Sequence, residues 1–328
     1  MGHTGYVRYI ILSFDREVLL VFVNFNLGET YMQNPYVDLD WSDWFPIENI
    51  GKNRSITSDE GLYRIRAIGE KKLSYIGQTG NSIRARLGQL SRGIFKDFMP
   101  YNDPHTAAPA FWALRQKQKI EFEASFCILK NLTTAERKGY ECLAIYDHRH
   151  KYGCSPSFNF GRMPLGYRKS SSNTKRLKEA GKRFRGGPVS EVLASHKQGL
   201  KPFPQANQNY KHADKLLLLD WSAWLTPEAF LNRLDGSETG IYIIRHINQS
   251  NFLYIGEGKI KDRIVSHLGK GKAKEHPQYY YFKDQKCIEL TYAHDANLEK
   301  HQRLEIENDL IGLHIKFYNR IPSAQFIG

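Results

Sequence analysis

Two short motifs occur in the same order and at the same spacing twice in this chain. The first copy has Gly61-Leu62-Tyr63 before Tyr75-Ile76-Gly77, and the second has Gly240-Ile241-Tyr242 before Tyr254-Ile255-Gly256. In both copies the two tyrosines are twelve residues apart. In the second copy, hydrophobic alternation on either side of the polar break at 248–251 predicts two strands joined by a turn. The recurrence of the ordered pair is a stronger signal than either triplet alone.

A second landmark repeats with nearly the same offset. Leu39–Trp44 reads LDWSDW and Leu219–Trp224 reads LDWSAW, each just upstream of its tyrosine pair. Two landmarks that share an offset of about 180 residues indicate duplication of a whole unit. We interpret the tryptophans as core anchors of each unit, with base-stacking platforms as the alternative.

Length and charge limit what the protein can be. At 328 residues the chain is long enough for about two domains, each with a core. The net charge of +13 and the pI near 9.4 favour a polyanionic partner, nucleic acid first, although a generally basic solvated surface is the alternative. The apolar segment 7–27 contains Asp15-Arg16-Glu17 and makes a poor signal peptide. Four cysteines without paired CxxC spacing favour reduced thiols in a cytoplasmic protein.

The composition divides the chain into four parts: an N-terminal extension (1–37) with two apolar runs that suggest strands, a first unit (38–160), a basic linker (161–216) and a second unit (217–328). The linker has 13 lysines and arginines against three acidic residues, a net +10. We expect it to lie along DNA phosphates, with a solvated spacer as the alternative. The residues expected to contact DNA are Arg168, Lys169, Lys175, Arg176, Lys182, Arg183 and Arg185, and the loop 91–109 is a further candidate for base contacts.

Hydrophobic periodicity predicts the same kinds of element in both units. In the first unit, Ser82 is a possible N-cap, and Thr133 or Thr134 is expected to cap a helix with Glu136 near its start. The first unit should contain helices after Ser82, at 111–119 and at 133–149, and a strand at 120–129. The second unit should contain helices at 227–234, 261–268 and 297–316, and strands at 240–246, 251–256 and 286–292.

The second unit also carries polar residues in a specific order after its tyrosines. Arg263 lies on the next helix, His267 follows four residues later on the same face, Glu307 lies in the final helix, and Asn319 comes after that helix. With the two triplets, this set resembles the GIY-YIG nuclease family. Restriction endonucleases of that family also carry a histidine at the position of His267.

The resemblance implies an α+β fold in which each unit is a small three-stranded antiparallel sheet flanked by helices. It also implies a divalent metal, Mg²⁺ or Mn²⁺, which Glu307 would hold at the scissile phosphate. Tyr242 would take the proton from water, and because the ordinary tyrosine pKa is about 10, it would need cationic charge nearby. Arg263 would neutralise the transition state.

Three other residues of the second unit have supporting roles in this reading. Tyr254 and His267 would position water and phosphate or share the proton transfer. Asn319 would orient its neighbours by hydrogen bonding. Each residue alone would more often be structural, since strand tyrosines commonly pack and helix arginines and glutamates commonly face solvent. It is their joint order that favours a site.

The first unit matches the same pattern less fully. Tyr63, Tyr75, Glu141 and Asn159 have counterparts in the second unit, and Glu141 is proposed as its metal ligand. The site of Asn159 suggests a six-residue insertion before it, because it follows Glu141 by eighteen residues whereas Asn319 follows its glutamate by twelve.

The arginine of the first unit is ambiguous from sequence. Arg84 reproduces the nine-residue spacing after the second tyrosine, whereas Arg86 is followed by leucine as in the family. We choose Arg86. Leu90 stands where the second unit has a histidine. The first unit is therefore either an active nuclease unit with a variant site or a catalytically inactive unit that still binds DNA.

The leading hypothesis, which the resemblance implies, is a divalent-metal-dependent DNA endonuclease of restriction or defence type. Two sites in one chain would let a monomer cut both strands of duplex DNA. A nuclease directed to branched or damaged DNA is the alternative among enzymes, and a DNA-binding protein with inactive nuclease units is the alternative from another class. Sequence does not exclude RNA as the substrate.

Overall fold

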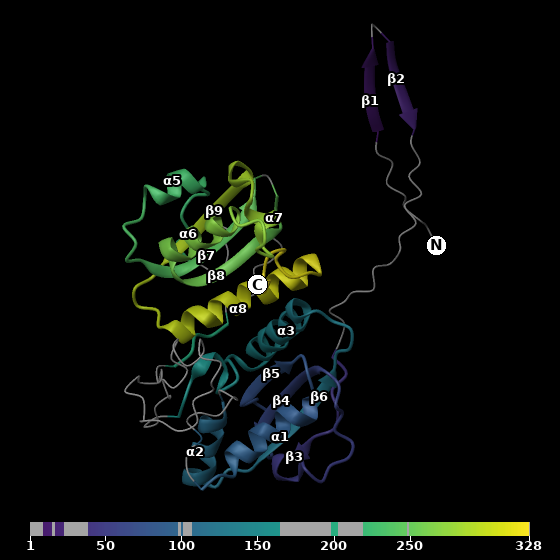
Figure 1. Ribbon diagram of the computed structural model, residues 1–328, viewed down its shortest axis with the longest axis vertical. Helices are drawn as coiled ribbons and strands as arrows, with labels where there is room; N and C mark the ends of the chain where they lie inside the picture. Colours follow the sequence, from purple (N-terminus) through teal and green to yellow (C-terminus); the bar gives the residue numbers. More distant parts are fainter. Residues whose placement is uncertain are drawn as a thin grey trace. The chain divides into compact units, whose positions relative to one another are not determined.

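The computed structural model describes residues 9–14, 17–22, 39–97, 100, 107–164, 198–202, 219–247 and 249–327. The chain divides into two compact units, Met1–Pro35 and Tyr36–Gly328. The first unit contains an antiparallel ribbon of β1 (Tyr9–Phe14) and β2 (Glu17–Phe22), the two strands expected from the apolar runs. The second unit contains both repeats (Figure 1).

The first repeat is a four-stranded antiparallel sheet with helices around it. Strand order is β3-β6-β4-β5. Thr133 caps α3 in a reciprocal capping box with Glu136, and Ser82 caps α1, both as the sequence predicted. The elements are β3 (Phe45–Pro46), the short helix η1 (Ile47–Asn49), β4 (Gly61–Ala67), β5 (Tyr75–Thr79), α1 (Ile83–Ile94), α2 (Ala108–Gln118), β6 (Phe122–Ile128), α3 (Thr134–Tyr152) and η2 (Asn159–Gly161).

The second repeat has the same order of elements around a three-stranded sheet, β8-β7-β9. Bridges from Trp221 to Ala293 and from Leu225 to Leu290 occupy the place that β3 has in the first repeat. The predicted α+β class is confirmed. The elements are α5 (Pro227–Leu231), β7 (Thr239–His246), β8 (Phe252–Lys259), α6 (Ile260–Lys270), α7 (Tyr279–Phe282), η4 (Gln285–Cys287), β9 (Ile288–His294) and α8 (Lys300–Tyr318).

Several boundaries differ from the sequence prediction. The final helix begins at Lys300, three residues later than expected, because Glu299 forms its N-terminal capping box. The segment 91–109 is not wholly a loop, since α1 extends into it to Ile94 and α2 begins at Ala108. Hydrophobic periodicity therefore predicts that these helices exist better than it predicts the residues at which they begin and end.

The glycine that ends each tyrosine motif is required by a close approach. Tyr63 pairs with Gly77 across β4 and β5, and Tyr242 pairs with Gly256 across β7 and β8. A Cβ atom on either glycine would overlap with the hydroxyl end of the tyrosine paired with it. The phenol of each first-strand tyrosine therefore lies directly over a glycine, which fixes where its hydroxyl points.

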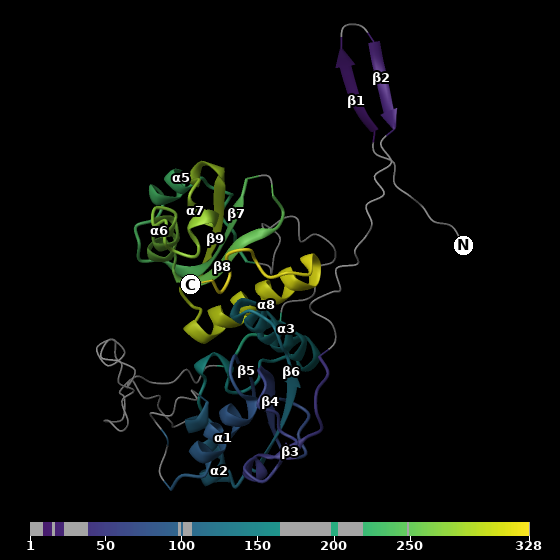
Figure 2. The ribbon, with the colours of Figure 1, turned by 45° about the vertical axis from the view of Figure 1, so that its right-hand side comes forward.

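The two repeats contact each other through α3 and α8, which lie side by side in Figures 1 and 2. Tyr146 and Gly312 are equivalent positions in the two helices, and a side chain on Gly312 would overlap with the Tyr146 ring. Contact between equivalent residues is what a two-fold arrangement of the repeats produces. The two repeats thus lie within one compact unit.

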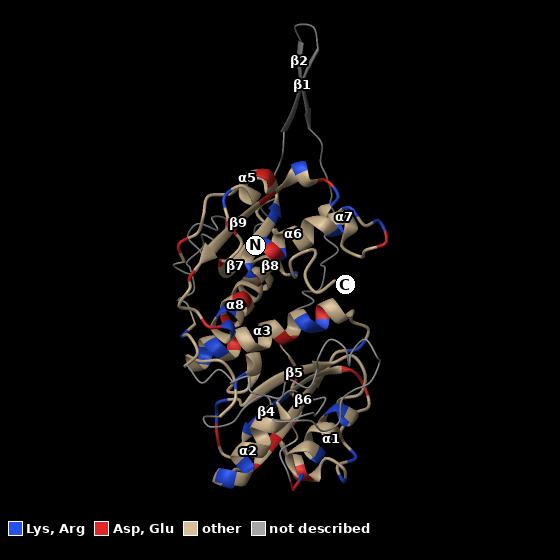
Figure 3. Cartoon of the chain, turned by 60° about the vertical axis from the view of Figure 1, so that its left-hand side comes forward, with Lys and Arg blue, Asp and Glu red and all other residues tan. Residues whose placement is uncertain are grey.

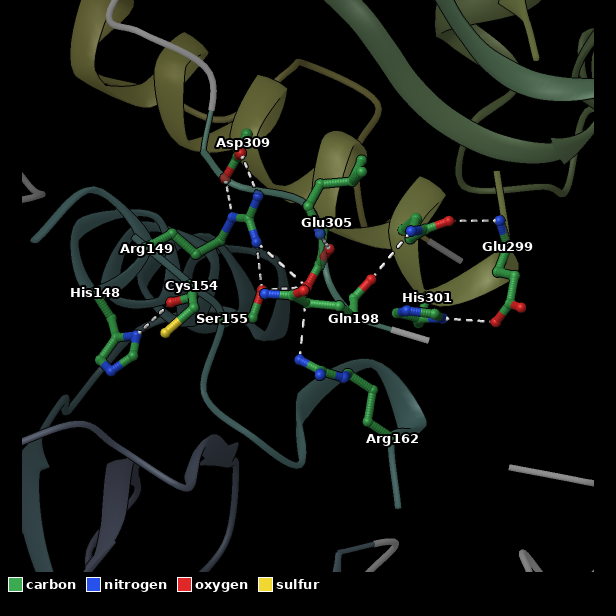
Figure 4. Close-up of polar contacts among 12 residues, drawn as sticks. His148, Arg149, Cys154, Ser155, Arg162, Gln198, Glu299, His301, Glu305 and Asp309 are labelled. Carbon is green, nitrogen blue, oxygen red and sulfur yellow. Dashed lines mark hydrogen bonds and ion pairs between the residues drawn. The ribbon is translucent and has the colours of Figure 1, made fainter. Parts of the chain in front are cut away.

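A buried ionic network joins the same two helices (Figure 4). Arg149 of α3 donates from Nε and Nη2 to the Asp309 carboxylate of α8, at 2.7 and 2.9 Å. Its Nη1 lies 3.3 Å from Glu305 and also donates to Ser155. Arg149, Glu305 and Asp309 are at most 1% exposed. Because one guanidinium serves two buried carboxylates, this contact is specific to one relative placement of the helices.

Charged residues of both signs are spread along the ribbon of both repeats (Figure 3). Of the basic linker, residues 161–164 and 198–202 are described, and the backbone N–H of Leu200 donates to Glu305. The seven linker residues expected to contact DNA, Arg168 to Arg185, lie outside the described residues.

All four cysteines are free thiols. Within the described part of the chain, no helix combines the length and apolarity that crossing a bilayer requires.

Candidate active site

The two motif tyrosines of the second repeat stack on adjacent strands. The Tyr242 and Tyr254 rings have centroids 6.1 Å apart and an interplanar angle of 10°. Tyr242 is fully buried, whereas Tyr254 is partly exposed. Burial raises the pKa of Tyr242 well above its usual value and that of Tyr254 to about 12, while nearby Arg263 acts in the opposite direction on both. Both phenols are therefore protonated at neutral pH unless further positive charge is present.

His267 lies against both tyrosines. Its Nε2 is 3.1 Å from the Tyr242 hydroxyl, and its ring centroid is 4.1 Å from that of Tyr254. Burial, together with the positive charge of Lys270 and Arg263, lowers the pKa of His267 to about 3, so its imidazole is neutral. The histidine is thus placed to share a proton with Tyr242.

Lys270, which the sequence analysis did not single out, sets the direction of that hydrogen bond. Its Nζ lies 3.4 Å from Nδ1 of His267 and donates to Gln278 at 2.7 Å. An ammonium group can only donate, so Nδ1 accepts and the single imidazole proton is on Nε2. His267 then donates to the Tyr242 oxygen, an arrangement that favours the phenolate form of Tyr242.

Glu307 faces the same cluster from α8. Its carboxylate is partly buried and makes no hydrogen bond or ion pair with any described residue. Burial and the nearby charge of Glu257 raise the pKa of Glu307 to about 8, while Arg263 acts in the opposite direction. A carboxylate held in this state without a partner leaves room for a cation.

The donor set fits a hard divalent cation. Mg²⁺ commonly binds through one or two carboxylates and completes its shell with water and substrate phosphate, and Glu307 offers one such carboxylate. Among the described residues no cluster of three or more His, Cys, Asp or Glu side chains could hold a metal ion alone. A cation here would therefore depend on water and substrate for its remaining ligands.

The first repeat reproduces the cluster with one exchange. Tyr63 and Tyr75 have centroids 6.1 Å apart, and Nε of Arg86 donates to the Tyr63 hydroxyl at 3.4 Å. Burial raises the pKa of Tyr63 to about 12, and Arg86 partly offsets this. Leu90 fills the place that His267 has in the second repeat. An N–H group thus faces the tyrosine oxygen in both repeats, from an arginine in one and a histidine in the other.

The structure distinguishes the two arginines of the first repeat. Arg86 is the fourth residue of α1, as Arg263 is of α6. Arg84 turns away and donates to the backbone carbonyls of Arg54 and Ile56. Spacing from the tyrosine misleads here, because the two helices begin at different distances from their strands.

Glu141 of α3 corresponds to Glu307. It too is partly buried without a hydrogen bond or ion pair to a described residue, and burial raises its pKa to about 7. The charges of Glu141 and Glu307 both raise the pKa of the Cys142 thiol, after burial itself. Both carboxylates therefore lie near Cys142, one on each side of the contact between α3 and α8.

The asparagine predicted for the second repeat was misassigned. Asn159 accepts from the Ile76 N–H at 2.9 Å and donates to its carbonyl at 2.8 Å. In the second repeat Gln325 makes the same pair of bonds with Ile255, at 3.0 and 3.1 Å. Asn319 instead ends α8 in a left-handed conformation (φ 54°). Counted to Gln325, the spacing from the glutamate is the same in both repeats, so there is no six-residue insertion.

A pair of histidines was missed. His148 accepts from the Leu73 N–H at 2.9 Å, and His314 accepts from the Phe252 N–H at 3.2 Å. Burial lowers the pKa of each to about 4, so both are neutral acceptors. Their seven-residue distance from Glu141 and Glu307 is the sequence signal that could have found them. They anchor the glutamate helices to the sheets.

Comparison of the chain with protein-family models, with curated proteins and with solved structures finds no match in any of the three.

Proposed function

We propose that the protein is a divalent-metal-dependent DNA endonuclease of the GIY-YIG type with one active site in each repeat. The observation that carries the proposal is the convergence, in each repeat, of two tyrosines, an arginine and an unpartnered glutamate whose pKa is raised. Four residues of three types, brought together from separate elements twice, form an arrangement that packing alone does not require.

In this proposal the residues of the second repeat divide the chemistry as follows. Glu307 holds Mg²⁺ or Mn²⁺, which when bound supplies positive charge at the scissile phosphate. Tyr242 accepts the proton of the attacking water, and the N–H of His267 stabilises the phenolate. Arg263, exposed on α6, lies where it can pair with the phosphate and offset the negative charge of the transition state.

In the first repeat Arg86 takes both cationic roles, since it contacts Tyr63 directly and acts electrostatically on Glu141. We propose that this variant site is active and that Glu141 is its metal ligand. The catalytic set is then Tyr63, Tyr75, Arg86, Glu141, Tyr242, Tyr254, Arg263, His267 and Glu307, with Asn159 and Gln325 as positioning residues.

Two sites joined through the packed pair of α3 and α8 suit cleavage of both strands of a duplex by a monomer. We propose a restriction-type or defence enzyme in the cytoplasm, which agrees with four free thiols. A repair nuclease would use the same chemistry, and it is favoured if branched DNA is cut while intact duplex is not. The class of inactive DNA-binding proteins is favoured only if DNA binds and no divalent metal supports cleavage.

The test uses supercoiled plasmid with Mg²⁺ and the single variants Glu307→Ala and Glu141→Ala. Each variant is expected to nick but not to linearise, because one strand-cutting site remains. Full linearisation by either variant would contradict one site per strand. Mg²⁺ should also raise the thermal midpoint of the wild type and fail to do so when both glutamates are replaced. Glu275→Gln, on an exposed loop, is the control.

A further inference from the structure

The first repeat contains a cavity of about 480 Å³ that the proposed active site does not use. Strand side chains alternate between faces, so Arg64 points to the side of the sheet opposite Tyr63. The cavity is on that opposite side, between the sheet and α3. Its walls are aromatic and aliphatic, from Trp41, Trp44, Leu73 and Tyr152, and its polar groups are mostly cationic.

Three of its cations have no acidic partner among the described residues: Arg64, Lys71 and Lys151. Two other cations of the lining are paired, Arg66 with Glu123 at 2.7 Å and Lys316 with Asp147 at 3.0 Å. Asp147 is the cavity's one acidic side chain among the lining residues. The cavity therefore carries an excess of positive charge.

Arg64 is held in place by its surroundings. Its guanidinium carbon lies 4.3 Å from the Trp41 ring centroid and 4.7 Å from that of Trp44, and its Nε donates to Ser125 at 3.3 Å. Its terminal nitrogens make no hydrogen bond with a described residue. Burial and the nearby Arg66 lower the pKa of Arg64 to about 10. A fixed, desolvated guanidinium with free donors is suited to an anion.

The second repeat fills the same place with hydrocarbon. Ile243 stands where Arg64 does, directly after the first motif tyrosine, and it is fully buried. Leu310 and Leu313 stand where Ala144 and Asp147 do. Ile243, Leu310 and Leu313 belong to a core cluster that includes Trp221 and Trp224. Since the scaffold closes this space with apolar side chains in one repeat, the open cationic version is not a requirement of the fold.

We infer that this cavity binds a nucleoside monophosphate unit, with the phosphate at Arg64, Lys71 and Lys151 and the base against the aromatic wall. The volume lies within the range of small-molecule sites, about 300–1,000 Å³, and exceeds what a phosphate alone needs. Cationic donors with aromatic rings are the combination that recognises nucleotides. The unit can be a free nucleotide or one within a DNA strand.

The test is calorimetric titration of the metal-free full chain in EDTA with 5′-AMP, adenosine, inorganic phosphate and a 5′-phosphorylated single-stranded hexamer. Lys71→Glu and Lys151→Glu, both at exposed lysines, are each expected to weaken binding at least tenfold. Lys52→Glu, an exposed lysine outside the cavity, should change nothing. Adenosine and phosphate should each bind at least tenfold more weakly than 5′-AMP.

Lysine-dependent binding of 5′-AMP supports a free nucleotide, and lysine-dependent binding of the hexamer alone supports a strand-borne one. Phosphate binding as tightly as 5′-AMP overturns the nucleoside part of the inference. Binding by both lysine variants that is as tight as binding by the wild type, or no binding of any ligand by the wild type, overturns it entirely. Glu307→Ala should bind as the wild type does, so failure of this inference is distinguishable from failure of the nuclease proposal.

Discussion

Replacing Glu307 with glutamine should stabilise the metal-free protein, and increasingly so as pH rises. In the folded protein the pKa of Glu307 is raised from 4.5 to about 8, chiefly by burial. The folded state therefore holds this proton between pH 4.5 and about 8, whereas the unfolded state releases it. The contribution of protonated Glu307 to the free energy of unfolding is fully present below pH 4.5 and is lost as pH rises to about 8. Glutamine does not ionise, so the Glu307→Gln variant does not lose this stability as pH rises.

The magnitude follows from the size of the shift. Each pKa unit corresponds to about 1.4 kcal/mol, so ionising Glu307 costs at most roughly 5 kcal/mol. The side chain is partly exposed, and solvent screening reduces this to about 2–3 kcal/mol. The difference in unfolding free energy between Glu307→Gln and wild type should therefore grow by roughly 0.7–1 kcal/mol per pH unit between pH 5 and pH 8.

The assay is urea unfolding in EDTA at four pH values, with Glu275→Gln as a control at an exposed glutamate that has no hydrogen-bond or ion-pair partner among the described residues. The control should track the wild type. If the Glu307→Gln difference is independent of pH, or decreases as pH rises, the reasoning about an unpartnered, desolvated carboxylate is wrong. The variant should also fail to linearise plasmid, so that loss of cleavage coincides with a gain in stability.

Three further outcomes test particular contacts. Arg149→Leu leaves buried Asp309 without its cation and Glu305 with only Arg162, at 4.0 Å, and should lower the unfolding free energy by about 3–5 kcal/mol, measured in urea; a loss below about 1 kcal/mol would contradict the buried network. Gly256→Ala places a Cβ against the Tyr242 hydroxyl and should cost about 1–3 kcal/mol and reduce cleavage, whereas an unchanged cleavage rate would refute the close-approach argument. Lys270→Met removes the donor to Nδ1 of His267 and should slow cleavage by roughly tenfold with little change in stability. Restoration of the rate by Lys270→Arg would support that positioning role, and a rate equal to wild type in Lys270→Met would exclude it.

Local sequence patterns determined much of this architecture. Alternation placed the paired strands, and side-chain caps at Ser82 and Thr133 started two helices, because these signals act between residues a few positions apart. The repeat of both motifs at one spacing also predicted the duplicated order of elements. The grouping of Tyr242 and Glu307 followed from the resemblance, not from any local pattern.

Tertiary structure decided what depends on contacts between distant segments. Gln325 makes in the second repeat the hydrogen bonds that Asn159 makes in the first. His267 likewise donates to its tyrosine as Arg86 does. Motif spacing could not predict either equivalence, because different residue types make the same contact in the two repeats. The joining of the repeats through Arg149 and Asp309 spans 160 residues, and no periodicity encodes it. Sequence alone fixes the elements because their signals are local, whereas burial and long-range pairing set the raised carboxylate pKa values and the cationic cavity.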